Sequence, residues 1–413
     1  MTQPIKDIAM THLATGTDYQ KLANHFRPVF HRIAAGTVER ERTRTLPVEQ
    51  IQWLKEATFG AVRIPVEKGG WGASLPQLFQ LLTELAEADS NIPQALRAHF
   101  AFVEDRLNQP DSPVQDRWFR RFLDGEIVGS GWTEIGNVKL GDVITQVTAK
   151  GERWELNGEK FYSTGTLFAD WIDVFARRTD NQRDVIAIVN THQSGVSRED
   201  DWDGFGQRLT GSGTTRFVAA DVEQDHVYDF SERFRYQTAF YQHVLLATLA
   251  GIARAVVRDA AAGVKARQRI YSHSNGNASR DDVQVLQVIG EISSLAFAVE
   301  ASVQRATHSL QSAYEAHILS DEGVIRDYNT VAEAEAGQAQ VIASDLVPRA
   351  ATLLFNALGA SDTRLSKALD RHWRNARTIA SHNPVIYKAR DIGNWLVNDV
   401  APTSIWAIGR GEG

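Results

Sequence analysis

The sequence predicts a mainly α-helical α+β protein built in three successive parts. Three observations lead to this prediction. Helical periodicity fills the first third of the chain, short strand-like segments fill the next hundred residues, and long helical segments then continue to the end. We therefore expect an N-terminal helical domain at 1–125, a β-barrel-like domain at 126–230 and a C-terminal four-helix bundle at 231–413.

The composition is typical of a globular protein. The chain has 413 residues, of which 43% are hydrophobic and 23% charged. The formal net charge is −7 and no block of like charges occurs, so nucleic acid is not an expected partner. Cysteine is absent, which excludes a disulfide framework, a thiolate nucleophile and a cysteine metal site.

Targeting, membrane and metal signals are also weak. Residues 1–18 have no apolar run of the signal-peptide type, and no stretch reaches the roughly 18 uninterrupted apolar residues of a membrane span. We expect a cytoplasmic protein with no membrane partner. No metal site is expected, because His273 has no carboxylate or histidine at helical spacing. The chain shows neither a Walker loop nor a Rossmann fingerprint.

The N-terminal part alternates helices with a glycine-rich loop. Helical segments begin at Tyr19 and Pro47, and the loop follows at 63–74. Ser74 is predicted to cap a helix whose leucines recur at helical spacing. A further helix is predicted from about Pro93.

The middle part is predicted to hold short strands. They are expected at Ile127–Glu134, Val143–Lys150, Trp171–Ala176, Val185–Val189 and Thr214–Asp221. Arg153–Tyr162 predicts two more strands around an Asn157-Gly158 turn, because Asn-Gly is the strongest short hairpin signal.

The C-terminal part is predicted to hold three long helices and a fourth, shorter one. The long helices are expected at 239–268, 283–314 and 331–358, the last closed by Gly359. In the fourth, Pro384 pushes Asn383 out of the α-helical region. We expect the helix to end there and to leave His382 at an edge, where a general acid or base reaches a ligand.

Four motifs, in this order, resemble the acyl-CoA dehydrogenase superfamily. They are a glycine loop at Pro65–Gly72, a Thr-Glu strand at Trp132–Asn137, an Asn-Gly-x-Lys segment at Leu156–Gly165, and Asn356–Ala360 followed by Arg374–Arg377. The resemblance implies that family's fold, a flavin where the three parts meet and a tetramer formed through the bundle.

One departure points to a particular branch. Most dehydrogenases of the family carry a glutamate base shortly after the Arg-Asp-Ala-Arg motif, although some carry it on a bundle helix. Here neither Asp nor Glu occurs between Arg377 and Asp391. Ser381–Pro384, Gly206–Thr215 and the tail through Arg410 resemble the flavin-dependent monooxygenases typified by dibenzothiophene monooxygenase.

The resemblance implies a two-component enzyme. Reduced FMN would come from a separate NAD(P)H:flavin reductase and react with O2 to a C4a-hydroperoxyflavin. One oxygen atom would pass to an apolar substrate, an organosulfur compound or aromatic heterocycle. FAD is the alternative cofactor. Two rival hypotheses are an acyl-CoA dehydrogenase that desaturates an acyl-CoA with FAD, and a flavin-binding relative that is not an enzyme.

The resemblance also implies site residues. His382 is the expected proton shuttle, because an imidazole with a pKa near 6.5 exchanges protons at neutral pH. The other catalytic candidates are Asn137, Ser163, Thr164 and His99. Flavin contacts are expected from Trp132, Thr133, Ser163, Thr164, Arg269 (or Arg267), and a neighbour's Tyr387 and Lys388. Substrate contacts are expected from His99, Phe100, Val103, Trp202 and Phe205. Each also has an ordinary structural explanation, such as a turn, a helix end or core packing.

Overall fold

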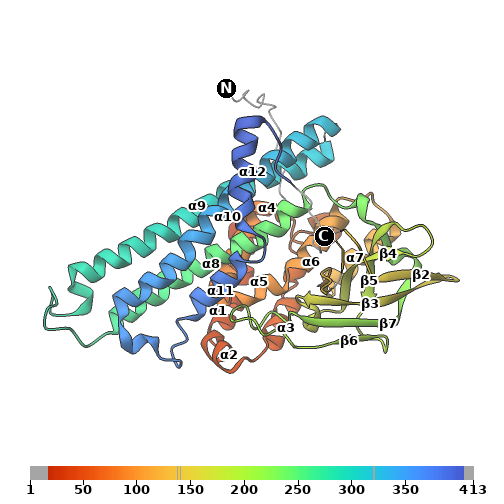
Figure 1. Ribbon diagram of the computed structural model, residues 1–413. Helices are drawn as coiled ribbons and strands as arrows, with labels where there is room; N and C mark the ends of the chain where they lie inside the picture. The colour runs from red at the N-terminus through yellow and green to blue at the C-terminus, as the bar shows by residue number, and fades with distance from the viewer. Residues whose placement is uncertain (1–16, 137, 140, 320, 404–413) are drawn as a thin grey trace.

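The protein is described by a computed structural model that covers residues 17–136, 138–139, 141–319 and 321–403. Figure 1 shows three long helices extending to one side and a β-sheet on the other, with α6 and α7 between them. The prediction of a mainly helical α+β fold is confirmed.

The N-terminal part is helical. Its helices are α1 (Tyr19–Ala34), α2 (Thr37–Thr43), α3 (Val48–Glu56), α4 (Leu75–Ala88), α5 (Asn91–Ala95), α6 (Arg97–Leu107) and α7 (Pro113–Leu123). The predicted cap of α4 is present, since the Ser74 side chain accepts from the Gln77 backbone and the Gln77 side chain accepts from the Ser74 backbone. The leucines of α4 are buried against α1, α8 and α9.

The strands form one mixed sheet. They are β1 (Val128–Gly131), β2 (Gln146–Lys150), β3 (Arg153–Ser163), β4 (Trp171–Arg178), β5 (Asp184–Asn190), β6 (Val196–Arg198), β7 (Gly213–Glu223) and β8 (Val227–Asp229). The order is β6-β7-β3-β2-β4-β5-β8, and β1 lies parallel to β4. The sheet curls so that β5 and β7 share one apolar core with β2, β3 and β4. Among the described strands, the ladder ends at β6 and β8 instead of closing.

The predicted Asn-Gly hairpin is wrong. Residues 153–163 form the single strand β3, and Asn157 and Gly158 lie at a bulge within it. The Asn157 side chain accepts a hydrogen bond from the Ala219 backbone at 2.8 Å. A Cβ on Gly158 would lie 2.5 Å from Thr145 Oγ1, so glycine allows a close approach there. The β2–β3 connection instead turns at Gly151, whose φ is +64°.

The C-terminal part is a bundle of α8 (Gln237–Ala266), α9 (Val283–Leu319), α10 (Glu322–Leu358) and α11 (Arg371–Ala380), followed by α12 (Val385–Asn398). Helix α10 begins at Glu322 and not at Val331, because Asp321 caps it by accepting from Gly323 and Val324. Gly359 ends it with φ +85°, as predicted. Short 3-10 turns occur at Phe59–Ala61, Val66–Lys68, Thr166–Phe168, Gln224–His226, Phe230–Glu232, Ser279–Asp281 and Ala360–Thr363.

Two bundle helices, α9 and α10, are long and apolar enough to cross a membrane by length and composition alone. Both contribute to one core with α8 and α11. Helix α9 also carries apolar side chains outside that core, and Phe297 is 75% exposed. Long bundle helices share these properties, so the test is weak evidence for a membrane span.

Candidate functional site

Three residues far apart in the sequence meet where α6, α8 and the α11–α12 turn come together. Arg97 Nη2 lies 3.0 Å from His382 Nε2, and the Arg97 guanidinium carbon lies 5.1 Å from the centroid of the Tyr241 ring. The Tyr241 ring lies 5.7 Å from the ring of Trp132, which follows β1. We call Arg97, Trp132, Tyr241, His382 and Asn383 the junction.

The turn that carries His382 is held by two bundle helices. Helix α11 ends at Ala380, so the helix stops before the Asn383 position that was predicted as its end. The Asn383 amide donates to Gln242 Oε1 on α8 at 2.7 Å, and its backbone carbonyl accepts from Gln340 Nε2 on α10 at 2.9 Å. These bonds fix the loop position of His382, which is solvent-exposed.

The hydrogen bonds define the tautomer of His382. An arginine only donates, so His382 Nε2 must be an acceptor and Nδ1 must carry the proton. Nδ1 then donates to Asn383 Oδ1 at 3.3 Å. Protein atoms around the imidazole and the positive charge of Arg97 lower the pKa of His382 to about 3. His382 is therefore neutral at pH 7 in the free protein, unlike the expected shuttle with a pKa near 6.5.

Arg97 is a cation without an anion. It is the first residue of α6 and is partly buried. Among the described residues, no carboxylate lies within ion-pair distance of its guanidinium. Burial lowers the pKa of Arg97 to about 10, a shift that the nearby Tyr241 opposes. The helix predicted from about Pro93 is two helices, α5 and α6, and the sequence pointed to no role for Arg97.

The Trp132-Thr133 segment is fixed against β3. The Phe161 backbone donates to Thr133 O at 2.9 Å, and Lys160 Nζ donates to Trp132 O at 3.3 Å and to Glu134 Oε1 at 2.7 Å. The Trp132 indole donates to Asp173 at 2.8 Å. The half-buried Thr133 hydroxyl makes no hydrogen bond within the described part of the chain, so it is available to a ligand.

The hydroxyls on the end of β3 face one another. Thr164 Oγ1 lies 2.7 Å from Ser212 Oγ, which lies 2.6 Å from Thr210 Oγ1. Ser163 is fully buried, and its hydroxyl donates to Lys160 O at 3.4 Å. Ser163 therefore points into the protein, and Thr164 belongs to a chain of three hydroxyls. Thr210 and Ser212 were missed as site residues, although both lie in the Gly206–Thr215 motif.

Tyr162 is a second residue that sequence reasoning missed. It is 53% exposed and has φ +54°, a left-handed conformation that costs a non-glycine residue about 1 kcal/mol or more. Its ring makes an edge contact with Trp202 at 5.8 Å. An exposed aromatic ring that precedes Ser163 and Thr164 in the chain offers a planar surface for a ligand.

Three predicted substrate residues belong to the core. His99 is fully buried; its Nε2 donates to Gly60 O at 3.0 Å, and its Nδ1 accepts from the Val128 backbone at 3.3 Å. Burial lowers the pKa of His99 to about 4. Phe100 and Val103 are fully buried in two apolar clusters. All three side chains are inaccessible in this structure, so the catalytic and substrate roles expected for them stay predictions.

The two aromatic candidates near α11 are accessible. Trp202 is partly buried, and its indole donates to Gly206 O at 3.1 Å. Phe205 is 54% exposed and stacks on Trp373 at 5.9 Å. Their contact with a substrate stays a prediction.

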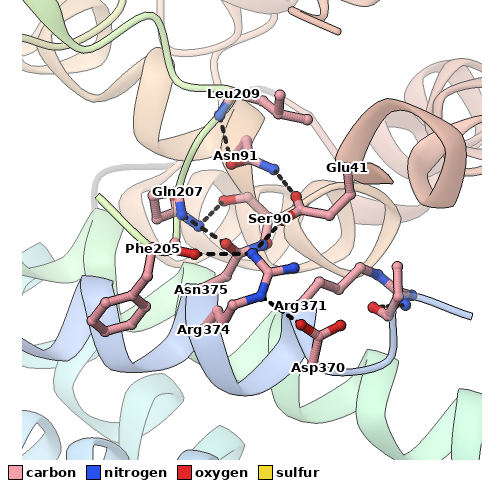
Figure 2. A network of polar contacts seen from close by, with 12 residues as sticks. Glu41, Ser90, Asn91, Phe205, Gln207, Leu209, Asp370, Arg371, Arg374 and Asn375 are labelled. Carbon is pink, nitrogen blue, oxygen red and sulfur yellow. Dashed lines mark hydrogen bonds and ion pairs between the residues drawn. The ribbon is translucent and has the colours of Figure 1, made fainter. Parts of the chain in front are cut away.

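The Arg-Asn-Ala-Arg motif clamps α11 in place (Figure 2). Arg374 Nη1 donates to Glu41 Oε1 and to Phe205 O, both at 2.9 Å. The Asn375 amide accepts from the Gln207 backbone at 2.7 Å and donates to Ser90 Oγ at 3.1 Å. Since the His382 turn follows α11 directly, this clamp positions the junction.

Several expected flavin residues lie away from the junction. Arg269 is exposed beyond the end of α8, a helix of 30 residues and therefore about 45 Å long, so it cannot reach Thr133 of its own chain. Tyr387 and Lys388 lie on α12, and Tyr387 is 49% exposed. Contacts of these residues with a flavin stay a prediction that requires a neighbouring copy. Asn137 lies outside the described residues.

One acidic cluster has the spacing of a metal site among the described residues. It comprises Glu223, Asp225 and His226. Arg117 pairs with Asp225, and Arg121 Nη1 lies 3.1 Å from His226 Nε2. Two arginines thus pair with the Asp225 carboxylate and the His226 ring nitrogen, which are groups that would otherwise bind a metal ion.

Comparison with known proteins shows which families and enzymes this chain is similar to. Residues 244–386 match the model of the acyl-CoA dehydrogenase C-terminal domain. The chain is 27% identical over 385 residues to a dibenzothiophene monooxygenase of Mycolicibacterium goodii, covering 88% of this chain and 91% of that protein. It is 28% identical over 389 residues to the probable FMNH2-dependent monooxygenase SfnC of Pseudomonas putida, covering 91% and 94%.

Solved structures agree. FMN-bound TdsC of Paenibacillus sp. A11-2 matches with a TM-score of 0.85 and 25% identity, over 93% of this chain and 99% of that one. The methanesulfinate monooxygenase MsuC of Pseudomonas fluorescens matches with a TM-score of 0.83 and 25% identity, over 94% and 99%. The fold is that of the acyl-CoA dehydrogenases, as predicted. The proteins of this fold to which the chain is similar include flavin-dependent monooxygenases.

Proposed function

We propose that the chain is the oxygenase component of a two-component monooxygenase that uses reduced FMN and O2. The observation that carries this proposal is the neutral His382 bonded to Arg97 just after α11, where most dehydrogenases of the family keep a glutamate. Two similarities support it, one to a protein named FMNH2-dependent and one to a structure named FMN-bound. A separate flavin reductase would then supply the cofactor.

The residues at the end of β3 suit a flavin. Tyr162 offers an exposed ring, and Thr133, which pairs with the neighbouring Phe161, offers a half-buried hydroxyl. The Lys160–Glu134 pair holds the Trp132-Thr133 segment rigid, so these groups are in place before a ligand binds. When bound, reduced FMN supplies the activation of O2.

The junction supplies the acid–base and shielding functions. His382 is a neutral base whose Nε2 can take a proton once Arg97 is engaged elsewhere. The Tyr241 ring lies beside Arg97 and packs against Trp132, which excludes water from that side of the guanidinium. Arg97 stabilises negative charge that develops on oxygen.

The proposed substrate class is organosulfur compounds. Relatives are named for an apolar heterocycle, dibenzothiophene, and for a small anion, methanesulfinate. A sulfur centre is common to both names.

We further propose that the chain forms a tetramer through the bundle. Exposed apolar side chains lie on α9 and on α12; they include Val283, Leu286, Phe297, Ile386, Leu396 and Val397. Such surfaces mark protein interfaces. A neighbouring copy would also bring an Arg269 to the flavin, which the same chain cannot do.

One observation favours the rival dehydrogenase. Glu333 is a buried glutamate on bundle helix α10, and its carboxylate accepts from the Thr238 hydroxyl. Burial raises the pKa of Glu333 to about 7, a value suited to a general base.

One experiment separates the two functions. The protein is supplied with FMN, a flavin reductase and NADH, and oxygen uptake is followed with and without dibenzothiophene or methanesulfinate. In a second arm, FAD-loaded protein is mixed with octanoyl-CoA and the flavin absorbance is recorded. Substrate-dependent oxygen uptake with product formation supports the proposal. Bleaching of FAD by octanoyl-CoA without any oxygenated product would overturn it in favour of the dehydrogenase.

A further inference from the structure

We propose that Arg97 binds an anionic oxygen group of the substrate, such as a sulfinate, sulfonate or carboxylate, at the junction. This inference rests on the proposed function and narrows its substrate class from organosulfur compounds in general to those that carry an anionic oxygen group.

The first argument is the contrast between Arg97 and the buried arginines. Five described arginines are buried, and each lies within 3.0 Å of a carboxylate; they are Arg40, Arg63, Arg106, Arg233 and Arg371. Arg97 instead has a neutral imidazole and the face of a phenol ring. Folding has therefore left this guanidinium without a counter-charge within the described chain.

The second argument is the number of open donors. A guanidinium carries five N–H groups in a planar fork, and within the described residues the Arg97 side chain makes one hydrogen bond, to His382. A partly buried cation without a paired charge is unfavourable, because protein replaces its water. The lowered pKa of Arg97 has this cause. A ligand with two oxygens on one atom fits the fork in a bidentate manner.

The third argument is the position of Arg97 on its helix. Arg97 begins α6, which runs for 11 residues, and no side chain caps this end. The first backbone N–H groups of a helix carry a partial positive charge that also favours an anion. Trp132 and Tyr241 border the other side, so an organic group attached to the anion would meet aromatic rings.

An anion at Arg97 would also change His382. If the N–H that donates to His382 turns to the ligand, His382 Nε2 loses its donor and becomes free to accept a proton. Substrate binding would thus prepare the base that the proposed function needs, without movement of the turn held by Gln242 and Gln340.

Reduced FMN is itself an anion, so its phosphate is a second group that Arg97 could bind. The experiment therefore measures flavin and substrate binding separately. Isothermal titration calorimetry of the full chain is done with methanesulfinate, benzenesulfinate, neutral dibenzothiophene and FMN, with reduced FMN titrated under anaerobic conditions.

Arg97→Met and Arg97→Lys are compared with Arg198→Met. Arg198 is a matched control, because it is partly buried and donates to the Thr166 and Ala169 carbonyls without a carboxylate. We expect Arg97→Met to weaken binding of both sulfinates by roughly 10- to 100-fold and to leave dibenzothiophene and both flavin states unchanged. Arg97→Lys should retain part of the affinity, and Arg198→Met all of it.

Three outcomes would overturn the inference. They are no sulfinate binding by the wild type, equal sulfinate binding by Arg97→Met, or a loss confined to reduced FMN, which would assign Arg97 to the cofactor. If Arg97→Met does not fold, Arg97→Lys is compared with the wild type. Equal sulfinate affinity of these two proteins would then overturn the inference. Sulfinate binding that depends on Arg97 but never leads to oxygenation would keep the anion site and refute the proposed function.

Discussion

Arg97 donates a hydrogen bond to His382 across 3.0 Å and so joins two residues 285 positions apart in the chain. This contact makes the imidazole a neutral acceptor and ties α6 to the turn after α11. Most acyl-CoA dehydrogenases are expected to carry a glutamate base close to this position. The contact with Arg97 gives this chain a neutral imidazole there instead.

Removal of the imidazole should abolish turnover without removing the flavin. In His382→Ala, FMN affinity should stay within about twofold, while product formation should fall by roughly 100-fold or more, the usual worth of a positioned base. Fluorescence titration of FMN and product analysis check this. His382→Gln is the matched variant, since its amide oxygen still accepts from Arg97. Turnover at the wild-type level in His382→Ala would refute the role.

The protonation of His382 should depend on Arg97. The pKa of His382 is lowered, first by the protein atoms around its partly exposed ring and then by the Arg97 charge, so the imidazole should not titrate between pH 5 and pH 8. In Arg97→Met one of these causes is gone, and the pKa should rise towards its ordinary range. NMR of the histidine ring protons measures this directly. A normal titration of His382 in the wild type would show that the cation does not act on it.

The buried pair of Lys160 and Glu134 should be needed for stability and for flavin binding. Both side chains are nearly inaccessible, at 0% and 7% exposed. Lys160→Met leaves the carboxylate without its cation and should lower the free energy of unfolding by about 3–5 kcal/mol in a urea titration. FMN affinity should fall too, because the Trp132-Thr133 segment loses its anchor. The double variant Lys160→Met/Glu134→Gln should recover much of the stability; no recovery would mean that the charge pairing is not the cause.

Acid should destabilise the protein through His99. The folded-state pKa is lowered to about 4, below the ordinary value near 6.5, so the unfolded chain binds a proton more readily. Stability from this group is full above pH 6.5 and falls as the pH drops towards 4, by about 3 kcal/mol in all. His99→Gln should show a shallower loss over this window in unfolding titrations at each pH. An unchanged slope would contradict the assignment of His99 as a neutral core residue.

A charge on α9 should break the proposed tetramer. Phe297 is 75% exposed on this helix, so Phe297→Glu should lower the molar mass measured by light scattering while the unfolding midpoint of the subunit changes little. Val218→Glu is the control, since Val218 is 71% exposed on β7, away from the bundle. An equal mass for Phe297→Glu and the wild type would place the interface elsewhere or show a monomer.

The order of helices and strands could be predicted from the sequence because hydrophobic periodicity and caps are local signals. Ser74 and Gly359 marked helix ends correctly, and the spacing of the leucines in α4 predicted its buried face. The Asn157-Gly158 pair wrongly predicted a hairpin turn. Its glycine instead allows β3 to pass close to Thr145, a contact that local sequence does not reveal.

The site was only partly predictable for the same reason. His382 was found through a departure from a motif, but its protonation depends on Arg97 from another helix. His99 was expected at the site because of the resemblance to the monooxygenase branch, yet Gly60 and Val128 occupy both of its nitrogens. Tyr162 gave a signal, an aromatic residue beside Ser163-Thr164, although its left-handed backbone is visible only in the structure.

The most direct test of the proposed function is the origin of the product's oxygen in a single turnover. The protein is mixed with chemically reduced FMN and methanesulfinate or dibenzothiophene, without a reductase, and exposed to isotopically labelled O2. Mass spectrometry of the product should show one labelled oxygen atom per turnover, and no product should form with oxidised FMN. Unlabelled product, or product formed without reduced flavin, would contradict the assignment of this chain as a flavin-dependent monooxygenase.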